Sequence, residues 1–439
     1  MSLGAFLYPG GHHVAAWRHP SSQADAGVNA AHYRQIARTA EAAGFDLLFL
    51  ADGVSIRGDD LDALSRTAIR YTGQFEPLTL LSYLAAVTER IGLVGTASTT
   101  YNEPFHVARK FASLDHLSEG RAGWNLVTSA DPREAWNFGR ESHMAHANRY
   151  ARAEEFVDVV RGLWDSYEDD AFVRDRREGR FFDPDRLHLL AHEGAHFSVR
   201  GPLNVPRPPQ GHPVVVQAGS SEAGKSLAAR TAEVIFTAQP SLEDATAFYA
   251  DVKGRMHAFG RDPDHLKIMP GAFPVVGRTE AEAQDKFAAL QDLIHPVVGR
   301  SLLEQLTGAD LSAYPDDALV PEMPETEGGR SRKDLFMALA RREGLTIRQL
   351  YLRAASARGH WTLVGTAGQI ADALQERFEA RGADGFNIMP PTLPGGLDDF
   401  VALVVPELRR RGLVRSGYEG RTLREHLGLP RPVHRIPGR

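Results

Sequence analysis

The chain alternates short apolar runs with longer segments of helical spacing, and this alternation limits its possible folds more than any other feature. Eight runs have the continuous apolar character of strands buried on both faces of a parallel sheet. They are residues 3–8, 46–52, 91–96, 121–128, 213–217, 233–237, 266–276 and 385–389. Strands that alternate regularly with helices predict an α/β protein, and eight such units predict a closed (β/α)8 TIM barrel. A doubly wound open sheet is the alternative.

Two connections are too long to be simple loops. Residues 165–211 contain two short alternating segments, which indicate a hairpin insertion. Residues 279–359 contain a charged stretch rich in proline and glycine, 315–332, and we interpret them as a lid-like insertion. Residues 1–412 then form a single barrel domain, and residues 413–439 form a C-terminal arm.

Composition excludes several classes of protein. The chain has no cysteine, which rules out disulfides and cysteine nucleophiles and favours a reducing compartment such as the cytoplasm. Its 56 acidic and 50 basic residues give a net charge of -6, so we expect no nucleic-acid partner. Residues 1–9 lack the pattern of a signal peptide, and no apolar run is long enough to span a membrane.

Residues 219–226, Gly-Ser-Ser-Glu-Ala-Gly-Lys-Ser, match the phosphate-binding P-loop pattern and lie between a predicted strand and a predicted helix. Two features disfavour an NTPase. Glu222 brings a negative charge into the loop, and the strand 233–237 ends without an acidic residue to hold magnesium. Two interpretations stay open: Ser220 or Ser221 caps the helix, or the helix N-terminus binds one phosphate of a nucleotide such as FMN.

The string His192-Glu-Gly-Ala-His196 matches the zinc-protease pattern H-E-x-x-H, which needs a helix to bring both histidines to one face. Gly194 lies inside the motif and residues 197–199 alternate like a strand, so we predict a hairpin with solvated histidines. The other histidines show no metal-ligand spacing, and we predict no metal site.

Nine strings, taken together, resemble the luciferase-like FMN-dependent monooxygenases. They are residues 11–20, 50–52, 95–105, 108–118, 120–129, 137–139, 201–204, 209–211 and 215–221. The resemblance covers about residues 3 to 410. It points to the branch that contains nitrilotriacetate monooxygenase, dibenzothiophene-sulfone monooxygenase and pristinamycin synthase. The barrel is therefore expected to be of the bacterial-luciferase type, with insertions.

The resemblance also implies an FMN site, formed by residues at the ends of the predicted strands and at the starts of two predicted helices. These residues are Asp52, Thr96, Ser98, Asn125, Ser129, His146, Tyr150, Gly219, Ser220 and Ser221. In this mapping the first five lie near the flavin ring or its ribityl chain, and the others hold the ribityl chain and the phosphate. Structural alternatives remain: Asp52 as a helix cap, Ser98 as barrel filling, and His146 with Tyr150 as ordinary helix surface.

Aromatic and histidine side chains of the first loop are candidates for the substrate side of the site, together with one histidine from the long insertion. They are Tyr8, His12, His13, Trp17 and His295. Arg18 and Arg57 could contact an anion, but the first loop has no cluster of arginines that points to one. The sequence identifies neither the substrate nor a catalytic residue.

The resemblance implies a two-component monooxygenase that receives FMNH2 from a separate NAD(P)H:flavin reductase. With O2 it would oxygenate carbon, nitrogen or sulfur of a small organic substrate, with or without cleavage of a C–N or C–S bond. A homodimer or homotetramer is expected on the same ground. The alternatives are an F420-dependent oxidoreductase of the same superfamily and a non-catalytic flavin-binding barrel.

Overall fold

A closed barrel of eight parallel strands forms the centre of the computed structural model, which describes residues 1–308, 310–321 and 330–435. The strands are β1 (Ser2–Leu7), β2 (Leu47–Leu50), β3 (Gly92–Ser98), β4 (Ala122–Val127), β7 (Val214–Ala218), β8 (Val234–Thr237), β9 (Lys267–Gly277) and β11 (Gly385–Ile388). The barrel closes because β9 pairs with both β8 and β11, and β11 pairs with β1. The predicted barrel is confirmed and the open sheet is wrong.

The strands lie within two residues of the predicted bounds, since continuous burial leaves a clear apolar signal. One further strand, β10 (Trp361–Thr366), was not predicted. It extends the sheet outside the closed barrel by pairing with the second half of β9, from Ala272 to Gly277. Most of its residues are only partly buried, which explains why its sequence lacks that signal.

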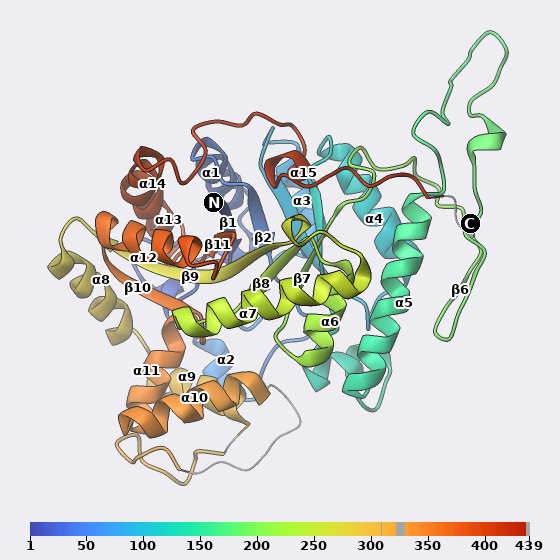
Figure 1. Ribbon diagram of the computed structural model, residues 1–439. Helices are drawn as coiled ribbons and strands as arrows, with labels where there is room; N and C mark the ends of the chain where they lie inside the picture. Colours follow the sequence, from blue (N-terminus) through green and yellow to red (C-terminus); the bar gives the residue numbers. More distant parts are fainter. Residues whose placement is uncertain (309, 322–329, 436–439) are drawn as a thin grey trace.

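Helices surround the barrel (Figure 1). They are α1 (Ala30–Ala42), α3 (Pro77–Ala85), α4 (Pro104–Leu117), α5 (His146–Trp164), α6 (Glu222–Thr231), α7 (Leu242–Arg255), α12 (Ala367–Glu379), α13 (Gly395–Asp399) and α14 (Val405–Arg410). Local chemistry sets their starts. Asn29, Ser221 and Ser241 each accept a hydrogen bond from an amide of the first turn, and Pro77 and Pro104 occupy first-turn positions.

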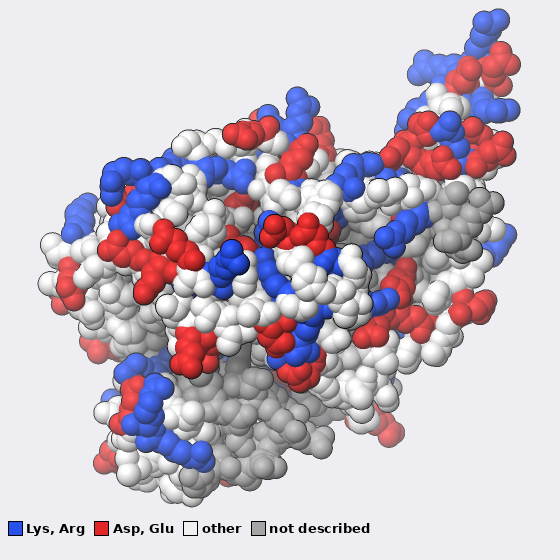
Figure 2. Space-filling model, in the orientation of Figure 1, with Lys and Arg blue, Asp and Glu red and all other residues white. Residues whose placement is uncertain are grey.

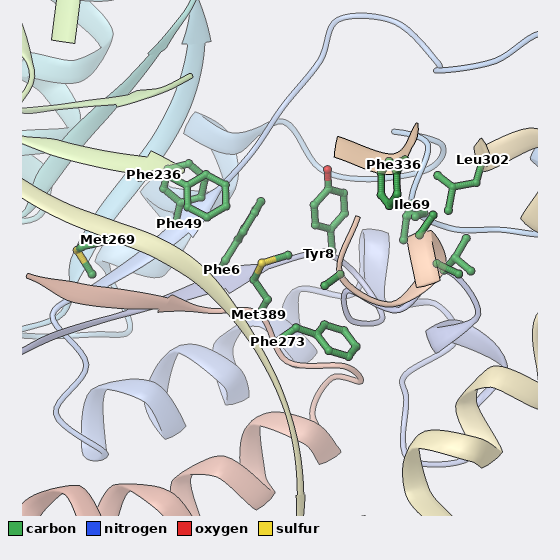
Figure 3. Close-up of a cluster of buried hydrophobic side chains, with 14 of the residues drawn as sticks. Phe6, Tyr8, Phe49, Ile69, Phe236, Met269, Phe273, Leu302, Phe336 and Met389 are labelled. Atoms are coloured by element: carbon green, nitrogen blue, oxygen red, sulfur yellow. The ribbon is translucent and has the colours of Figure 1, made fainter. Parts of the chain in front are cut away.

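The described part of the chain between β9 and β10 is mostly helical. It contains α8 (Glu280–Asp292), α9 (Pro296–Thr307), α10 (Arg330–Glu343) and α11 (Ile347–Ala357). Helix α9 packs against α11 and against α2 (Leu61–Ser65), which follows β2. Figure 3 shows Leu302 of α9 and Phe336 of α10 close to Ile69 in one apolar cluster with Tyr8, which follows β1. Residues 322–329 of the predicted charged stretch lie outside the described residues.

Residues 165–211 project from the barrel as a long arm that carries interspersed acidic and basic side chains (Figures 1 and 2). Within it β5 (His192–Glu193) pairs antiparallel with β6 (Ser198–Val199). The C-terminal segment, including α15 (Leu423–His426), runs back across the barrel towards this arm. Arg424 of α15 forms an ion pair of 2.6 Å with Glu233, at the amino end of β8. Among the described residues, no helix is long and apolar enough to cross a membrane.

Candidate active site

The carboxyl ends of the barrel strands surround a cavity of about 310 Å³. Residues in or just after β1, β2, β3, β4, β7 and β8 contribute to its wall, and α9 closes one side. A larger and more open hollow of about 510 Å³ lies over α1, away from the strand ends. Because active sites of such barrels lie at the carboxyl ends of the strands, the smaller cavity is the candidate active site.

Thr96 and Asn125 meet on the cavity wall, where β3 and β4 lie side by side. The Thr96 hydroxyl donates to the carbonyl of Leu50 at 2.8 Å and accepts a hydrogen bond of 2.8 Å from Asn125 Nδ2. This arrangement makes Oδ1 the remaining acceptor of Asn125, and it is buried without a partner among the described residues. Buried polar atoms are rarely left unpaired, so this oxygen is suited to accept an N–H group of a ligand.

Ser98 and Ser129 also come together, at the ends of the same two strands. Their hydroxyl oxygens are 2.8 Å apart. Ser129 has a φ of +56°, and its carbonyl accepts a hydrogen bond from Arg149 of α5. Neither serine lines the cavity, but they link its wall to the start of α5.

A second polar group lies where the N-terminus of α6 faces the first turn of α5. The rings of His146 and Tyr150 pack together with their centroids 4.8 Å apart, and the Tyr150 hydroxyl is 3.4 Å from Ser221 Oγ. Ser221 caps α6 by accepting the amide of Gly224 at 3.1 Å. Gly219, with a φ of +136°, and Ser220 are exposed beside it. A helix N-terminus with hydroxyl groups around it is a typical anion site.

The lysine of the P-loop-like string does not point toward this loop. Lys225 forms ion pairs with Asp251 of α7, at 2.6 Å, and with Glu222. Arg255 pairs with the same glutamate at 2.7 Å. Both cations are therefore neutralised on the outside of α6 and α7, which disfavours an NTPase, because that chemistry needs the lysine on the phosphates.

The structure separates the five candidates for the substrate side. Tyr8 lines the cavity, and its hydroxyl is 3.0 Å from that of Tyr71. His12, His13, Trp17 and His295 are not among the lining residues. Trp17 instead donates its indole N–H to the carbonyl of Arg66 at 3.0 Å, and His295 precedes the first turn of α9.

His12 and His13 are fully buried and serve the packing of the first loop. Burial lowers the pKa of His12 well below its usual value, and the charge of Arg358 adds to this effect. The neutral ring donates from Nε2 to the carbonyl of Phe6 at 2.9 Å and accepts from Arg358 at Nδ1. Burial lowers the pKa of His13 to about 3, so it is also neutral at physiological pH.

Several wall residues were not predicted from the sequence. Arg70 and Tyr71 lie in the loop between β2 and α3, whereas Arg358 and His360 lie just before β10. No periodic pattern marks such loop positions, and the two groups lie far apart along the chain. Arg57, a candidate from the sequence for contact with an anion, also lines the cavity.

Asp52 lines the cavity directly after β2. Burial raises the pKa of its carboxyl to about 7, and the nearby charges of Glu76 and Glu134 act in the same direction. A carboxyl with this pKa exchanges its proton near neutral pH, so it can hold a proton at the edge of a bound ligand.

Comparison with known proteins identifies the family of the chain. A family model described as luciferase-like monooxygenase matches residues 11–385. The chain belongs to this family. An N-acetyl-S-(2-succino)cysteine monooxygenase of Bacillus subtilis is 54% identical to it, with 99% of this chain and 98% of that protein covered. Nitrilotriacetate monooxygenase component A of Aminobacter aminovorans is 52% identical, with the same coverage.

Solved structures of other proteins share the fold of this chain. A solved structure of a riboflavin lyase with modified FMN is 34% identical and has a TM-score of 0.86, with 99% of this chain and 97% of that chain covered. An F420-dependent secondary alcohol dehydrogenase is only 14% identical, with a TM-score of 0.59, and shares the fold alone. The family and its close relatives identify the chain as a monooxygenase enzyme.

The structure also explains the zinc-protease-like string of this family member. His192 lies in strand β5 of the hairpin, not in a helix. Glu155 of α5 accepts a hydrogen bond of 2.9 Å from His192 Nε2, and the amides of His196 and Phe197 donate to the same carboxylate. The string therefore anchors the hairpin to α5. Within the described residues, no group of three or more histidine, aspartate or glutamate side chains is arranged to hold a metal ion.

Proposed function

We propose that the chain is a flavin-dependent monooxygenase that uses reduced FMN and O2 to oxygenate a small organic substrate. The observation that carries this proposal is the layout of the site. A polar group at the N-terminus of α6 is suited to a phosphate, and Ser129 and Arg149 connect it to a cavity with an unpaired acceptor on Asn125. One phosphate at a distance from one hydrogen-bonding ring is the pattern of FMN.

The residues have separate parts in this proposal. Ser220, Ser221 and the amide groups of the first turn of α6 bind the phosphate, with His146 and Tyr150 beside the ribityl chain. Thr96, Asn125 and Asp52 orient the ring, and Ser98 and Ser129 lie between the two ends. When bound, reduced FMN supplies the electrons that activate O2.

Apolar side chains keep water away from the ring in this proposal. Phe6, Phe49 and Phe236 line the cavity, and their rings pack together inside the barrel (Figure 3). Helix α9 adds Leu302 and Leu306 from the insertion. A dry site favours transfer of oxygen to substrate over loss as hydrogen peroxide, and this gives the insertion its role as a lid.

The reduced flavin comes from a separate NAD(P)H:flavin reductase in our proposal. One relative is named component A of its monooxygenase, which indicates a system with more than one component. A cytoplasmic homodimer or homotetramer remains our expectation. The named substrates of relatives range from nitrilotriacetate and dibenzothiophene sulfone to long-chain alkanes, so relationship alone does not choose a substrate for this chain.

Anaerobic titration of the protein with reduced FMN, reduced F420 and ATP tests this proposal. We expect reduced FMN to bind with a dissociation constant in the micromolar range, and F420 and ATP to give no saturable signal. Binding of F420 without FMN would establish the oxidoreductase alternative instead. Tight binding of FMN without oxygenation of any substrate, in the presence of a reductase and O2, would favour the non-catalytic flavin-binding barrel.

A further inference from the structure

Three arginines converge on one side of the cavity. Arg57 and Arg70 come from the loop after β2, and Arg358 comes from the turn after α11. Arg70 is only 3% exposed. Within the described part of the chain, none of the three forms an ion pair with a carboxylate. Unpaired cations are costly to keep in a protein interior, so this cluster needs a purpose other than stability.

Most of the hydrogen-bonding capacity of the cluster is unused. The Arg57 guanidinium lies 4.4 Å from the centre of the Tyr71 ring and donates no hydrogen bond to a described residue. Arg70 Nε is buried without a partner among those residues, and its Nη1 makes one long contact of 3.4 Å with the carbonyl of Arg57. Both side chains line the cavity, so their free donors are available to a ligand there.

Arg358 is held in place without being neutralised. It donates to the carbonyl of His12 at 3.0 Å and to Nδ1 of the same residue at 2.8 Å. Since His12 is neutral, these contacts fix the guanidinium but leave its charge uncompensated. The positive field is evident at Arg70, whose pKa is lowered to about 10, first by burial and then by the charges of Arg57 and Arg358.

Nearby acids balance this charge only in part. Three carboxyls have charges that interact with Arg57: Asp52, Glu134 and Asp131. Burial raises the pKa of Asp52 and Glu134, and Asp131 is already paired with Arg133 at 2.8 Å. Apart from Asp52, the residues proposed for FMN lie in or after β3, β4 and β7 or at the starts of α5 and α6, whereas the arginines lie after β2 and after α11. The cluster is therefore placed for a second, anionic ligand and not for the flavin phosphate.

We propose that the substrate is a small organic anion with at least two carboxylate groups, bound by Arg57, Arg70 and Arg358. The planar guanidinium group binds carboxylates through paired hydrogen bonds. Tyr8, Ile69 and Leu302 line the same cavity and contact the apolar part of the molecule. This inference rests on the proposed function, because it assigns a substrate class to that same site.

The test uses the protein reconstituted with FMN and a panel of unreactive probes. Succinate, glutarate and propane-1,2,3-tricarboxylate are compared with their neutral amides by isothermal titration calorimetry. We expect at least one carboxylate to bind with a dissociation constant below about 1 mM and its amide to bind at least tenfold more weakly. Replacing Arg57, Arg70 or Arg358 by Gln should weaken that binding at least tenfold, because each change removes charge-assisted hydrogen bonds.

Arg34→Gln, on the exposed face of α1, is the matched control and should leave carboxylate binding unchanged. Lysine variants at the three positions keep the charge and should retain part of the binding if glutamine variants fold poorly. FMN affinity is measured for every variant and should change less than threefold. If no carboxylate binds better than its amide, or if the arginine variants bind it normally, this inference is wrong while the flavin proposal stands. If FMN affinity falls as much as carboxylate affinity, the arginines serve the flavin and the inference is also wrong.

Discussion

We expect Ser221→Asp to weaken FMN binding at least 100-fold without lowering the stability of the protein. Aspartate caps helices as well as serine does, and a negative charge at a helix N-terminus is favourable, so α6 should stay intact. The same carboxylate would lie where we place the FMN phosphate. Two like charges about 4 Å apart near a protein surface repel by several kcal/mol, which exceeds the roughly 2.7 kcal/mol of a 100-fold change.

Ser221→Asn is the matched control, because asparagine caps the helix without adding charge. It should keep FMN affinity within about tenfold, and both variants should unfold at or above the temperature of the parent protein. Fluorescence titration with FMN and thermal unfolding provide the two readouts. Equal affinities for the aspartate and asparagine variants would show that the phosphate binds elsewhere, and that Ser221 is only a helix cap.

Asp52→Asn should change how stability depends on pH. Burial raises the pKa of Asp52 to about 7 in the folded protein, against 3.8 for the ordinary side chain. Between these values the folded state binds more protons than the unfolded state, so the parent protein loses stability as pH rises. Asparagine does not titrate, so the variant does not lose stability in this way as pH rises. From pH 5 to pH 8 we expect the variant to gain about 2 kcal/mol relative to the parent, a value reduced because the carboxyl partly faces the cavity.

Urea unfolding at several pH values measures this difference. Asp292→Asn, at an exposed position at the end of α8, is the control and should follow the parent curve within about 0.5 kcal/mol. Groups that titrate in both proteins cancel in the comparison. Parallel curves for Asp52→Asn and the parent would mean that the carboxyl is well solvated, and that it holds no proton at the site near neutral pH.

The barrel could be predicted from the sequence because each buried strand leaves a signal in its own residues. A strand such as Leu47–Leu50 is covered on both faces, so every residue is apolar and the run stands out. The same argument explains why β10 was missed, since it lies outside the closed barrel and keeps one side partly exposed. The helices of the long insertion carry helical patterns, but their position over the cavity depends on contacts such as those that place Leu302 and Ile69 in one cluster.

The candidate site was predictable where it follows the strand ends or a helix start. Thr96, Asn125, Tyr150 and Ser221 lie where the sequence places them, and the structure brings them together in two pairs. Their roles toward FMN stay predictions. The arginine cluster could not be derived in the same way, because Arg358 reaches the cavity only through the closure of the barrel and of the insertion.

Loop composition alone also failed to distinguish buried from lining side chains. His12 and His13 are adjacent polar residues, yet both turn inward, and the hydrogen bonds of His12 to Phe6 and Arg358 become visible only in three dimensions. Conversely, two sequence motifs match known functional patterns although the structure does not form the corresponding sites. Lys225 and His192 match well-known patterns, but each is tied to a carboxylate outside any site those patterns require.

The central claim is that this barrel binds reduced FMN in a dry cavity and directs its reaction with O2. The most direct test mixes the protein, saturated anaerobically with reduced FMN, with oxygenated buffer in a stopped-flow spectrophotometer. Our account predicts a long-lived near-ultraviolet absorbance that precedes oxidised FMN and decays faster when the right substrate is present. Immediate appearance of oxidised FMN, at the rate seen without protein, would contradict the claim.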